Sequence, residues 1–573
     1  MSSTDAEVRI GDRYDVVILG GGLSGHTLAL QLKSARPEST VLIAERRAEP
    51  APEAAFKVGE STVEISAHYF SEVVGMKEHL ETEQLHKAGL RYFFPADGNE
   101  DIVARFEWGP AQFAPKVAYQ LDRGRFENAL WEASDAAGVH VLGGSTADSV
   151  VFGEDEHTVT LNHAGSTTHV KARWVVDATG RAGVIRRKLG LEREVDHKIN
   201  ASWFRLAGGI DISDWSNDPG WQRRVASRAV RHQSTNHLMG EGYWVWLIPL
   251  VSGPISIGIV ADPRFHPYEQ INTLDGALEW LRGHEPQLGA IATDRRDQVE
   301  DFLTFEHFSY GCERIYSPDR WALSGEAGVF IDPLYSPGSD FIAMGNTFIT
   351  DLVTRDLNGD DIGERLEFYN SHILLLFNAY LGIYTDHYAE FGNQHVMAMK
   401  LLWDFSIYWS ISSLRFVNGK LADLPFTQAI MPHLGSVFQM TARMQQVFRS
   451  WHRLSSPHEW PGFVSSNGIP LVHEKQAALD TPISDDEELK ARFAANSEFL
   501  RALAVLIFHE ALRSLPLPAI EENQPINPLA LSLDPDRWEV DGLFDEAGLS
   551  LARARQIAPG VDEQWLGEQL AAA

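Results

Sequence analysis

The sequence predicts an α/β protein in two parts: an interwoven α/β module over residues 1–350, followed by a mainly α-helical C-terminal region over residues 351–573. Strand-like apolar runs alternate with helical spacing up to about residue 345, which is typical of a sheet covered by helices. From about residue 347 onward, large apolar residues recur at helical spacing instead. This change of period is the boundary that we predict between the two parts.

The N-terminal segment has the pattern of a βαβ unit. Residues 14–19 (YDVVIL) form a short, branched, apolar run that predicts a buried parallel strand. Three glycines follow, then helical apolar spacing over residues 24–32 and a second buried strand at residues 40–44. Strand, glycine-rich turn, helix and strand together predict a Rossmann-type dinucleotide-binding unit.

The rest of the module adds strands. We expect them at residues 139–142, 158–161, 174–176, 243–248, 255–259 and 321–324. The runs at residues 243–248 and 255–259 predict neighbours in an antiparallel sheet that is interwoven with the first unit. Beyond residue 402 the chain is expected to stay mainly helical, with proline-rich breaks near residues 514–536.

Composition excludes several classes of partner. The net charge is −30, with 49 basic against 79 acidic residues, so neither nucleic acid nor an anionic membrane is expected as a partner. The one cysteine, Cys312, excludes disulfides within the chain and cysteine-based zinc sites, and the histidines have no metal-ligand spacing. The apolar run at residues 373–384 is too short to cross a bilayer, and residues 1–20 lack a signal-peptide pattern. We therefore expect a cytoplasmic protein without a metal site.

Gly20, Gly22 and Gly25 match the pattern G-x-G-x-x-G between a strand and a helix. The first permits a tight turn, the second lets a pyrophosphate approach the backbone, and the third lets the helix pack closely on the strand. Ser24 lies within this turn and is expected to contact the cofactor. Glu45 follows 20 residues after Gly25 at a strand end, where a carboxylate binds ribose hydroxyls and repels a 2′-phosphate. The pattern favours FAD or NAD over NADP.

Later segments favour FAD by resemblance. Arg123, in the segment DRGRF, resembles the arginine motif of hydroxylase-type flavoproteins. Gly325 and Glu326, in the segment SGEAG, resemble the second flavin motif of that superfamily, in which an acidic residue contacts the ribityl chain. The family usually has Gly-Asp there, so Asp332 is the other candidate carboxylate. The segment WVVDATG at residues 174–180 is similar to the strand that returns to the nucleotide in the same proteins.

The segment YWVWLIP carries a more specific match. Trp244 and Trp246, followed by Ile248 and Pro249, match the W-x-W-x-I-P signature of the flavin-dependent halogenases. Alternate residues of a strand point to the same face, so both rings are expected beside the flavin, where they would keep organic substrate away from the isoalloxazine. The other reading is a pair of core tryptophans that pack on a sheet.

Upstream residues extend the resemblance. Residues 59–62 (GEST) resemble the Gly-Glu-Ser/Ala segment of halogenases, and Lys87 follows 27 residues beyond Glu60, just before a glycine-containing strand. The resemblance implies that Lys87 is the catalytic lysine, whereas a lysine by itself is usually a solvated surface group. A carboxylate near it would stabilise a cationic ring intermediate, and Glu60 and Glu64 are the candidates.

A third match, DPLYSPG at residues 332–338, departs from the family at two positions. In the tryptophan-specific members a glutamate takes the place of Tyr335, so the resemblance implies a phenol, pyrrole or indole-like substrate instead of free tryptophan. In the family, backbone amides of the residues that match Pro337 and Gly338 hold the halide. Proline has no N–H, so one of the two donors is missing here.

The resemblance implies an FADH2-dependent halogenase. A separate flavin reductase would supply the reduced FAD, and chloride or bromide would become hypohalous acid, which passes to Lys87 and halogenates an electron-rich aromatic ring. The ammonium of Lys87 would polarise this acid, or its neutral amine would form a haloamine. The substrate is either free or carrier-bound. Two other readings stay open: a single-component FAD-dependent aromatic monooxygenase or related oxidoreductase, and a halogenase-like flavoprotein without halide binding.

Overall fold

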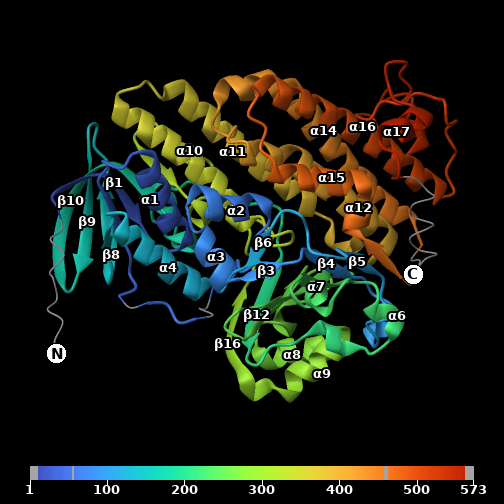
Figure 1. The fold of residues 1–573 in the computed structure, drawn as a ribbon, viewed down its shortest axis with the longest axis horizontal. Helices are drawn as coiled ribbons and strands as arrows, with labels where there is room; N and C mark the ends of the chain where they lie inside the picture. The colour runs from blue at the N-terminus through green and yellow to red at the C-terminus, as the bar shows by residue number, and fades with distance from the viewer. Residues whose placement is uncertain (1–10, 49, 54–56, 457–461, 562–573) are drawn as a thin grey trace.

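The computed structural model describes residues 11–48, 50–53, 57–456 and 462–561. Two eight-stranded sheets lie next to each other along the long axis, and helices from the C-terminal part cover both (Figure 1). The first sheet contains β1 (Arg13–Leu19), β2 (Val41–Ala44), β7 (His140–Leu142), β8 (Ser145–Val151), β9 (His157–His163), β10 (Ser166–Asp177), β18 (Tyr316–Ser317) and β19 (Trp321–Leu323).

The first sheet is the predicted Rossmann-type unit. Its order is β18-β19-β10-β1-β2-β7, and β9 and β8 extend it from β10. β1 lies in parallel between β10 and β2, with Val17 opposite both Val175 and Leu42. Val17 is fully buried, as expected for a parallel strand covered on both faces. The helices α4 (Arg123–Ala136) and α10 (Gly338–Asn358) both pack against α1 (Leu23–Ala35) beside this sheet.

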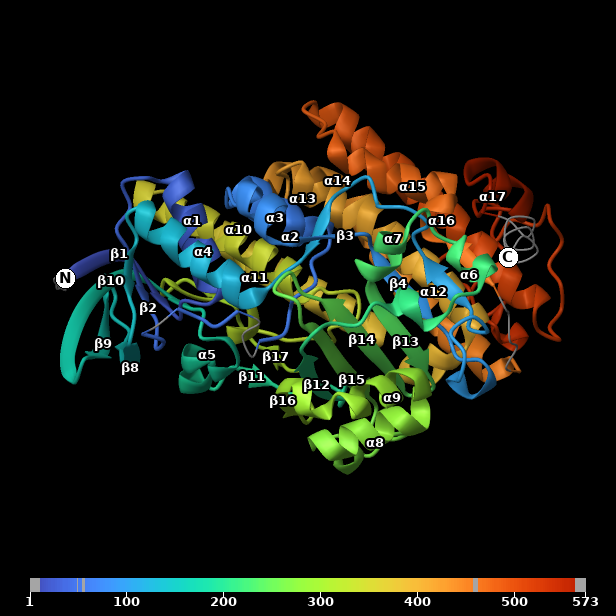
Figure 2. The same cartoon turned by 60° about the horizontal axis from the view of Figure 1, so that its bottom comes forward.

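The second sheet is mainly antiparallel and has the order β16-β12-β15-β14-β13-β4-β5-β20. Its strands are β4 (Leu90–Phe93), β5 (Glu107–Gly109), β12 (Asn200–Leu206), β13 (Thr235–Gly240), β14 (Tyr243–Pro249), β15 (Ile255–Ala261), β16 (Val299–Phe305) and β20 (Phe463–Ser465). One face is covered by α8 (Leu274–His284) and α9 (Pro286–Asp294), as Figure 2 shows.

Successive side chains of β14 point to opposite faces of the second sheet. Tyr243, Val245 and Leu247 pack in the smaller core under α8 and α9. Trp244 and Trp246 belong to the main core on the opposite face, toward the C-terminal helices. The period of two in the strand therefore places both tryptophans on one side of the sheet, as predicted.

The C-terminal part is mainly helical, as predicted, and in Figure 1 it runs along the top of both sheets. Its longer helices are α11 (Gly363–Tyr384), α12 (Gln394–Ile407), α14 (Leu424–Leu454), α15 (Pro470–Ala477), α16 (Asp486–Arg513) and α17 (Leu551–Ile557). This part also contributes β20, which pairs in parallel with β5 and which the sequence did not indicate. The expected boundary at residue 350 falls inside α10. Within the described ranges, no helix combines the length and apolarity needed to cross a membrane.

Candidate functional site

The glycine turn lies at the carboxyl end of β1, where backbone segments approach too closely for a side chain. A Cβ on Gly25 would lie 2.0 Å from the carbonyl oxygen of Gly20, and a Cβ on Gly20 would lie 2.5 Å from that of Ala178. Gly20 also has a φ of +102°, which favours glycine. At Gly22, by contrast, the nearest atom to a Cβ is the Nζ of Lys57 at 3.8 Å. The space beside Gly22 is thus open to a ligand.

Glu45 follows β2 and is tied to this turn. Its Oε2 accepts a hydrogen bond from the Gly21 amide at 2.6 Å, and its Oε1 accepts one from the Arg47 amide at 2.9 Å. Each carboxylate oxygen has two lone-pair sites, so both retain capacity for a ribose hydroxyl.

A cluster of basic side chains surrounds the buried carboxylate of Glu127 on α4. Arg123 Nη2 donates to it at 2.6 Å, Lys57 contacts it as a second ion pair, and Arg47 Nη1 lies 3.7 Å away. Burial alone would raise the pKa of Glu127, but Arg123 and Lys57 bring it below its usual value. Among the described residues, the buried Nε and Nη2 of Arg47 have no hydrogen-bond partner.

This arrangement fits the diphosphate of FAD. Three cations share one carboxylate, so a positive excess remains beside the open face of Gly22. Arginine donors without partners and a helix N-terminus are the groups that bind phosphate oxygens. Arg123 was predicted, whereas Arg47 and Lys57 were missed because they converge only through the fold. The sequence could have revealed them through their neighbours, because Arg47 lies close to Glu45 and Lys57 lies close to the GEST segment.

The inner cavity, of about 1180 Å³ with part of it open to solvent, gathers most of the other predicted cofactor residues. Its lining includes Arg123, Gly325, Glu326, Asp332, Trp244 and Trp246. Burial raises the pKa of the Glu326 carboxyl, and the charge of Arg181 opposes this rise. The hydroxyls of Ser24 and Ser324 are hydrogen-bonded to each other, which joins the glycine turn to the Gly325 segment.

The two signature tryptophans line the inner cavity from β14, with ring centroids 5.7 Å apart. Trp246 Nε1 donates to Ser256 Oγ at 3.1 Å. On the neighbouring strand, a Cβ on Gly258 would lie 2.1 Å from the Trp246 ring, so the missing side chain makes room for the indole. The rings thus form a fixed wall of the cavity.

Asp332 is completely buried and is held by donors of the protein itself. Its Oδ2 accepts from His197 Nε2 at 2.9 Å and from the Tyr388 hydroxyl at 2.5 Å. Its Oδ1 accepts from the Leu334 amide at 2.9 Å. These contacts make Asp332 an anchor of its own loop, and they leave Glu326 as the more accessible of the two predicted carboxylates.

Lys87 ends the short strand β3 (Leu85–Lys87), which pairs with β6 (Ala118–Gln120), and it is only 3% exposed. Its Nζ donates to Ser61 Oγ at 2.8 Å and to the Thr62 carbonyl at 2.6 Å. Burial lowers the pKa of this amine to about 7, although Glu64 and Asp340 oppose the shift. Lys87 is therefore a buried group that exchanges its proton near neutrality.

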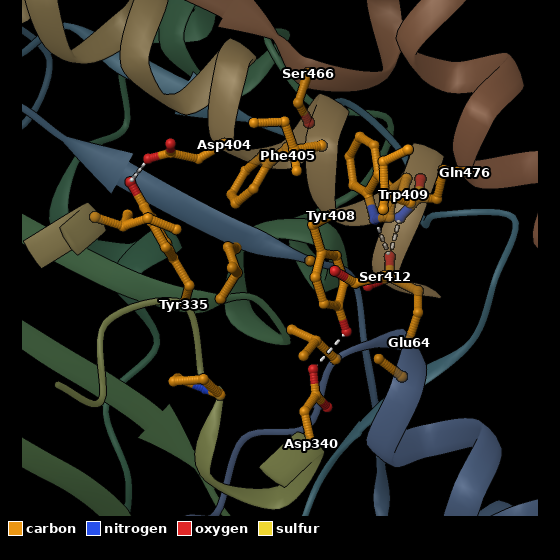
Figure 3. A pocket seen from close by; sticks show the side chains of 18 of the residues that line it. Glu64, Tyr335, Asp340, Asp404, Phe405, Tyr408, Trp409, Ser412, Ser466 and Gln476 are labelled. Carbon is orange, nitrogen blue, oxygen red and sulfur yellow. Dashed lines mark hydrogen bonds between the residues drawn. The ribbon is translucent and has the colours of Figure 1, made fainter. Parts of the chain in front are cut away.

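Lys87 lines a second cavity, the aromatic cavity, of about 1370 Å³ with part of it open to solvent. Aromatic side chains form a large part of its wall, among them Trp108. Phe405, Tyr408 and Trp409 are further examples and are drawn in Figure 3. More than half of the lining residues come from the C-terminal part, mainly from α11, α12, α14, α15 and the segment Tyr408–Ser413. The sequence did not indicate that these helices build a cavity.

A strained turn separates the two cavities. Tyr335 and Ser336 have φ values of +70° and +61°, a left-handed conformation that is costly for residues with side chains. Tyr335 and Pro337 line the aromatic cavity, whereas Ser336 lines the inner cavity. The Ser336 hydroxyl donates to Ser61 Oγ at 3.0 Å, so Ser61 joins this turn to Lys87.

The two candidate carboxylates lie on different sides of this turn. Glu60 lines the inner cavity and accepts from Arg205 Nη2 at 2.9 Å. Glu64 lines the aromatic cavity together with Lys87. Its Oε1 accepts from Trp409 Nε1 at 2.8 Å and from Gln476 Nε2 at 2.6 Å, as Figure 3 shows. Glu64, not Glu60, is thus the candidate that shares a cavity with the lysine.

Sequence reasoning missed a third carboxylate, Asp340, in the first turn of α10. It is completely buried and lines the aromatic cavity. Its Oδ1 accepts from the Ser66 amide at 2.9 Å and its Oδ2 from the Tyr408 hydroxyl at 2.7 Å. Burial raises the pKa of Asp340 to about 7. The feature of the sequence that could have revealed Asp340 is its position three residues after Pro337.

The predicted halide residues lie at the start of α10. Pro337 occupies the N-cap position and has no N–H to offer, and Gly338 lines the inner cavity. The halide site therefore stays a prediction, with the Gly338 amide as its remaining backbone donor.

Comparison with known proteins agrees with these features. The family model described as FAD binding domain matches residues 13–248. The flavin-dependent halogenase chlA of Dictyostelium discoideum is 24% identical over 437 residues, which cover 71% of this chain and 71% of that protein. The 1H-pyrrole-2-carbonyl-(peptidyl-carrier protein) chlorinase of Pseudomonas fluorescens is 26% identical over 371 residues, which cover 61% of this chain and 77% of that protein.

A solved structure extends the likeness to the C-terminal helices. Halogenase PltM in complex with phloroglucinol and FAD aligns with a TM-score of 0.58 at 17% identity, covering 88% of this chain and 97% of that chain. At this identity the likeness shows the fold, and the predicted fold class is confirmed. The sequence matches confirm the predicted resemblance as well. We conclude that this chain contains an FAD binding domain and that it is similar in sequence to flavin-dependent halogenases over more than half of its length.

Proposed function

We propose that this chain halogenates an electron-rich aromatic compound other than free tryptophan, and that Lys87 is its catalytic lysine. The observation that carries the proposal is the position of this amine. Lys87 lines the aromatic cavity, while Ser61, which accepts its hydrogen bond, lines the inner cavity. The hydrogen bond between Lys87 and Ser61 thus links the proposed substrate compartment to the proposed flavin compartment.

When bound, reduced FAD supplies, with oxygen, the oxidising equivalents that convert chloride or bromide to hypohalous acid. The proposed cofactor contacts are Gly20, Gly22, Ser24, Gly25, Glu45, Arg123, Gly325, Glu326 and Asp332. Trp244 and Trp246 would shield the flavin side of the inner cavity. The Ser61–Ser336 contact would restrict the passage of the organic substrate between the two cavities. Lys87 would receive the hypohalous acid and orient it toward the ring.

The aromatic walls favour a flat, apolar substrate, because stacked and edge-on ring contacts hold a ring in a fixed orientation. Tyr335 occupies the position at which the tryptophan-specific halogenases have a glutamate. Its hydroxyl donates to Asp404 at 3.2 Å. As further partners we propose a flavin reductase and a substrate that is either free or carrier-bound, as the name of the Pseudomonas relative states for that protein.

The test combines the protein with FAD, a flavin reductase, NADH, bromide and a panel of phenols, pyrroles and indoles that includes phloroglucinol. Products are identified by mass. We expect a brominated product from the parent and none from Lys87→Met, which has similar length and no charge. Lys188→Met, at an exposed lysine, is the matched control and should retain the parent activity.

Two results would change the assignment. A product that persists undiminished in Lys87→Met removes Lys87 from the reaction. Substrate-stimulated NADPH consumption without added reductase, and without any halogenated product, identifies a single-component monooxygenase instead.

A further inference from the structure

The aromatic cavity holds a second ionisable group beside Lys87 that the proposed function does not yet use. Asp340 and Lys87 come from elements far apart in the sequence, yet both are fastened to the segment Ser61–Ser66. Lys87 Nζ donates to the Thr62 carbonyl, and Ser66 donates its amide to Asp340. Both side chains are buried and line the same cavity.

We propose that Asp340 is the catalytic carboxylate that accepts the proton released when the aromatic ring is halogenated, and that Lys87 and Asp340 work as an acid–base pair. This inference rests on the proposed function and adds a residue to it. Asp340 does not occupy the position of the family glutamate, where this chain has Tyr335.

The chemistry of ring halogenation requires both members of the pair. The bond between oxygen and halogen breaks with its electron pair on oxygen, while a π-electron pair of the ring forms the carbon–halogen bond. The electron pair of the ring C–H bond then restores the aromatic system, and its proton passes to Asp340. The oxygen leaves as water with a proton from the Lys87 ammonium, and Asp340 returns its proton to the Lys87 amine. Overall, aromatic C–H and hypohalous acid give aromatic carbon–halogen and water.

The surroundings of Asp340 suit a proton acceptor. Each of its oxygens accepts one hydrogen bond, from Ser66 or Tyr408, and keeps a second lone-pair site. Its position in the first turn of α10 adds the favourable field of the helix N-terminus. The titratable groups that interact with it are Lys87, Glu64, Tyr380 and Tyr408, and a second lysine, Lys116, lines the same cavity. In Figure 3 Asp340 and Tyr408 point toward each other.

Glu64 is suited to a different task. Its Oε1 accepts hydrogen bonds from both Trp409 and Gln476, which fix the orientation of this carboxylate. Burial brings the pKa of Asp340, by contrast, to about 7, in the range where the Lys87 amine titrates. Matched values let a proton pass in either direction with little driving force. Glu64 is therefore held in place by its two donors, and Asp340 is the carboxylate that we assign as the proton carrier.

The test uses Asp340→Asn, which keeps the shape of the side chain and removes the base, with Asp340→Glu as the conservative variant. Asp360→Asn, at an exposed aspartate just after α10, is the matched control. The substrate is the phenol of the panel that the parent halogenates, in ring-protiated and ring-deuterated forms. Hypohalous acid is measured separately with a small 1,3-diketone as a diffusible scavenger, and bound FAD by its absorbance.

We expect Asp340→Asn to bind FAD and to deliver hypohalous acid to the scavenger as the parent does, while kcat for the phenol falls roughly 100-fold. Loss of the ring proton should become rate-limiting, so a deuterium isotope effect that is absent in the parent should appear. The acidic limb of the pH profile of kcat should disappear, and Asp340→Glu should restore part of the rate.

Other outcomes separate the two proposals. If Asp340→Asn halogenates the phenol at the parent rate without an isotope effect, Asp340 is not the proton acceptor, although the proposed function stands. If the variant loses hypohalous acid or FAD together with product, or if Asp340→Glu restores nothing, its role is structural and the inference is wrong. If the parent itself produces neither hypohalous acid nor halogenated product, the proposed function fails.

Discussion

The indole N–H of Trp244 donates to the hydroxyl of Tyr388 at 3.0 Å, which joins the signature strand to the C-terminal helical part. The same hydroxyl donates to Asp332, which also accepts from His197. A tryptophan of the inner cavity is therefore held by a residue 144 positions later in the chain. The helical part thus supports a wall residue of the inner cavity, whereas it lines the aromatic cavity directly.

Removing this link should loosen the inner cavity. Tyr388→Phe leaves a buried indole N–H and a buried carboxylate without one partner each, so we expect a loss of about 1–3 kcal/mol in the free energy of unfolding. Chemical denaturation measures it, and the flavin affinity of the variant should fall as well. Tyr268→Phe is the control, because that half-buried hydroxyl only accepts from Thr304. Equal effects from both substitutions would contradict the argument.

Two glycines of the turn should respond differently to alanine. Gly25→Ala places a Cβ 2.0 Å from the Gly20 carbonyl oxygen, so the helix must shift and both stability and FAD binding should decrease. Gly22→Ala meets no atom closer than 3.8 Å, so its melting temperature without FAD should match that of the parent. Its FAD affinity should nevertheless fall, because the methyl group occupies the approach of the pyrophosphate. Unchanged FAD affinity in Gly22→Ala would remove the turn from the cofactor site.

Gly258→Ala tests the wall of the inner cavity. The added Cβ would lie 2.1 Å from the Trp246 ring, so the indole must move, and overpacking of this kind costs about 1–3 kcal/mol. We expect lower stability and a changed tryptophan fluorescence spectrum. In Gly435→Ala, within α14, the new Cβ meets no atom within 4 Å, and that variant should be as stable as the parent or slightly more stable. A Gly258→Ala protein with the parent spectrum and stability would mean that Trp246 does not fill this space.

The buried amine of Lys87 should make stability depend on pH. Burial lowers its pKa from 10.5 to about 7, so between these values the unfolded chain binds the proton that the folded chain has released. The free energy of unfolding therefore rises with pH across this window, and below it the folded state carries the full cost of a buried charge.

Lys87→Met removes that dependence. The melting temperature of the variant relative to the parent should be highest at about pH 7 and should decline toward about pH 9.5. Lys188→Met, at an exposed position, should follow the parent at both values. The same difference at both pH values would mean that the folded protein keeps the Lys87 ammonium charged.

Local patterns in the sequence determined the parts of this protein that depend on short-range geometry. The spacing of Gly20, Gly22 and Gly25 predicted the turn, because a Cβ at Gly20 or Gly25 would clash with a backbone carbonyl oxygen where strand and helix meet. The alternation in YWVWLIP predicted that Trp244 and Trp246 share one face, because a strand has a period of two. The mainly helical C-terminal part followed from its hydrophobic spacing in the same way.

Only the tertiary structure decided the chemistry of the site. Lys87 has a lowered pKa because distant segments exclude water from it, and burial of this kind has no local signature. Asp340 shares a cavity with Lys87 although 253 positions separate them, and most of the aromatic side chains in the cavity wall come from the C-terminal part. Glu60 and Glu64 are four residues apart yet face different cavities. Contacts between remote segments set proton affinity and enclosure, whereas sequence spacing reports only on neighbours within one element.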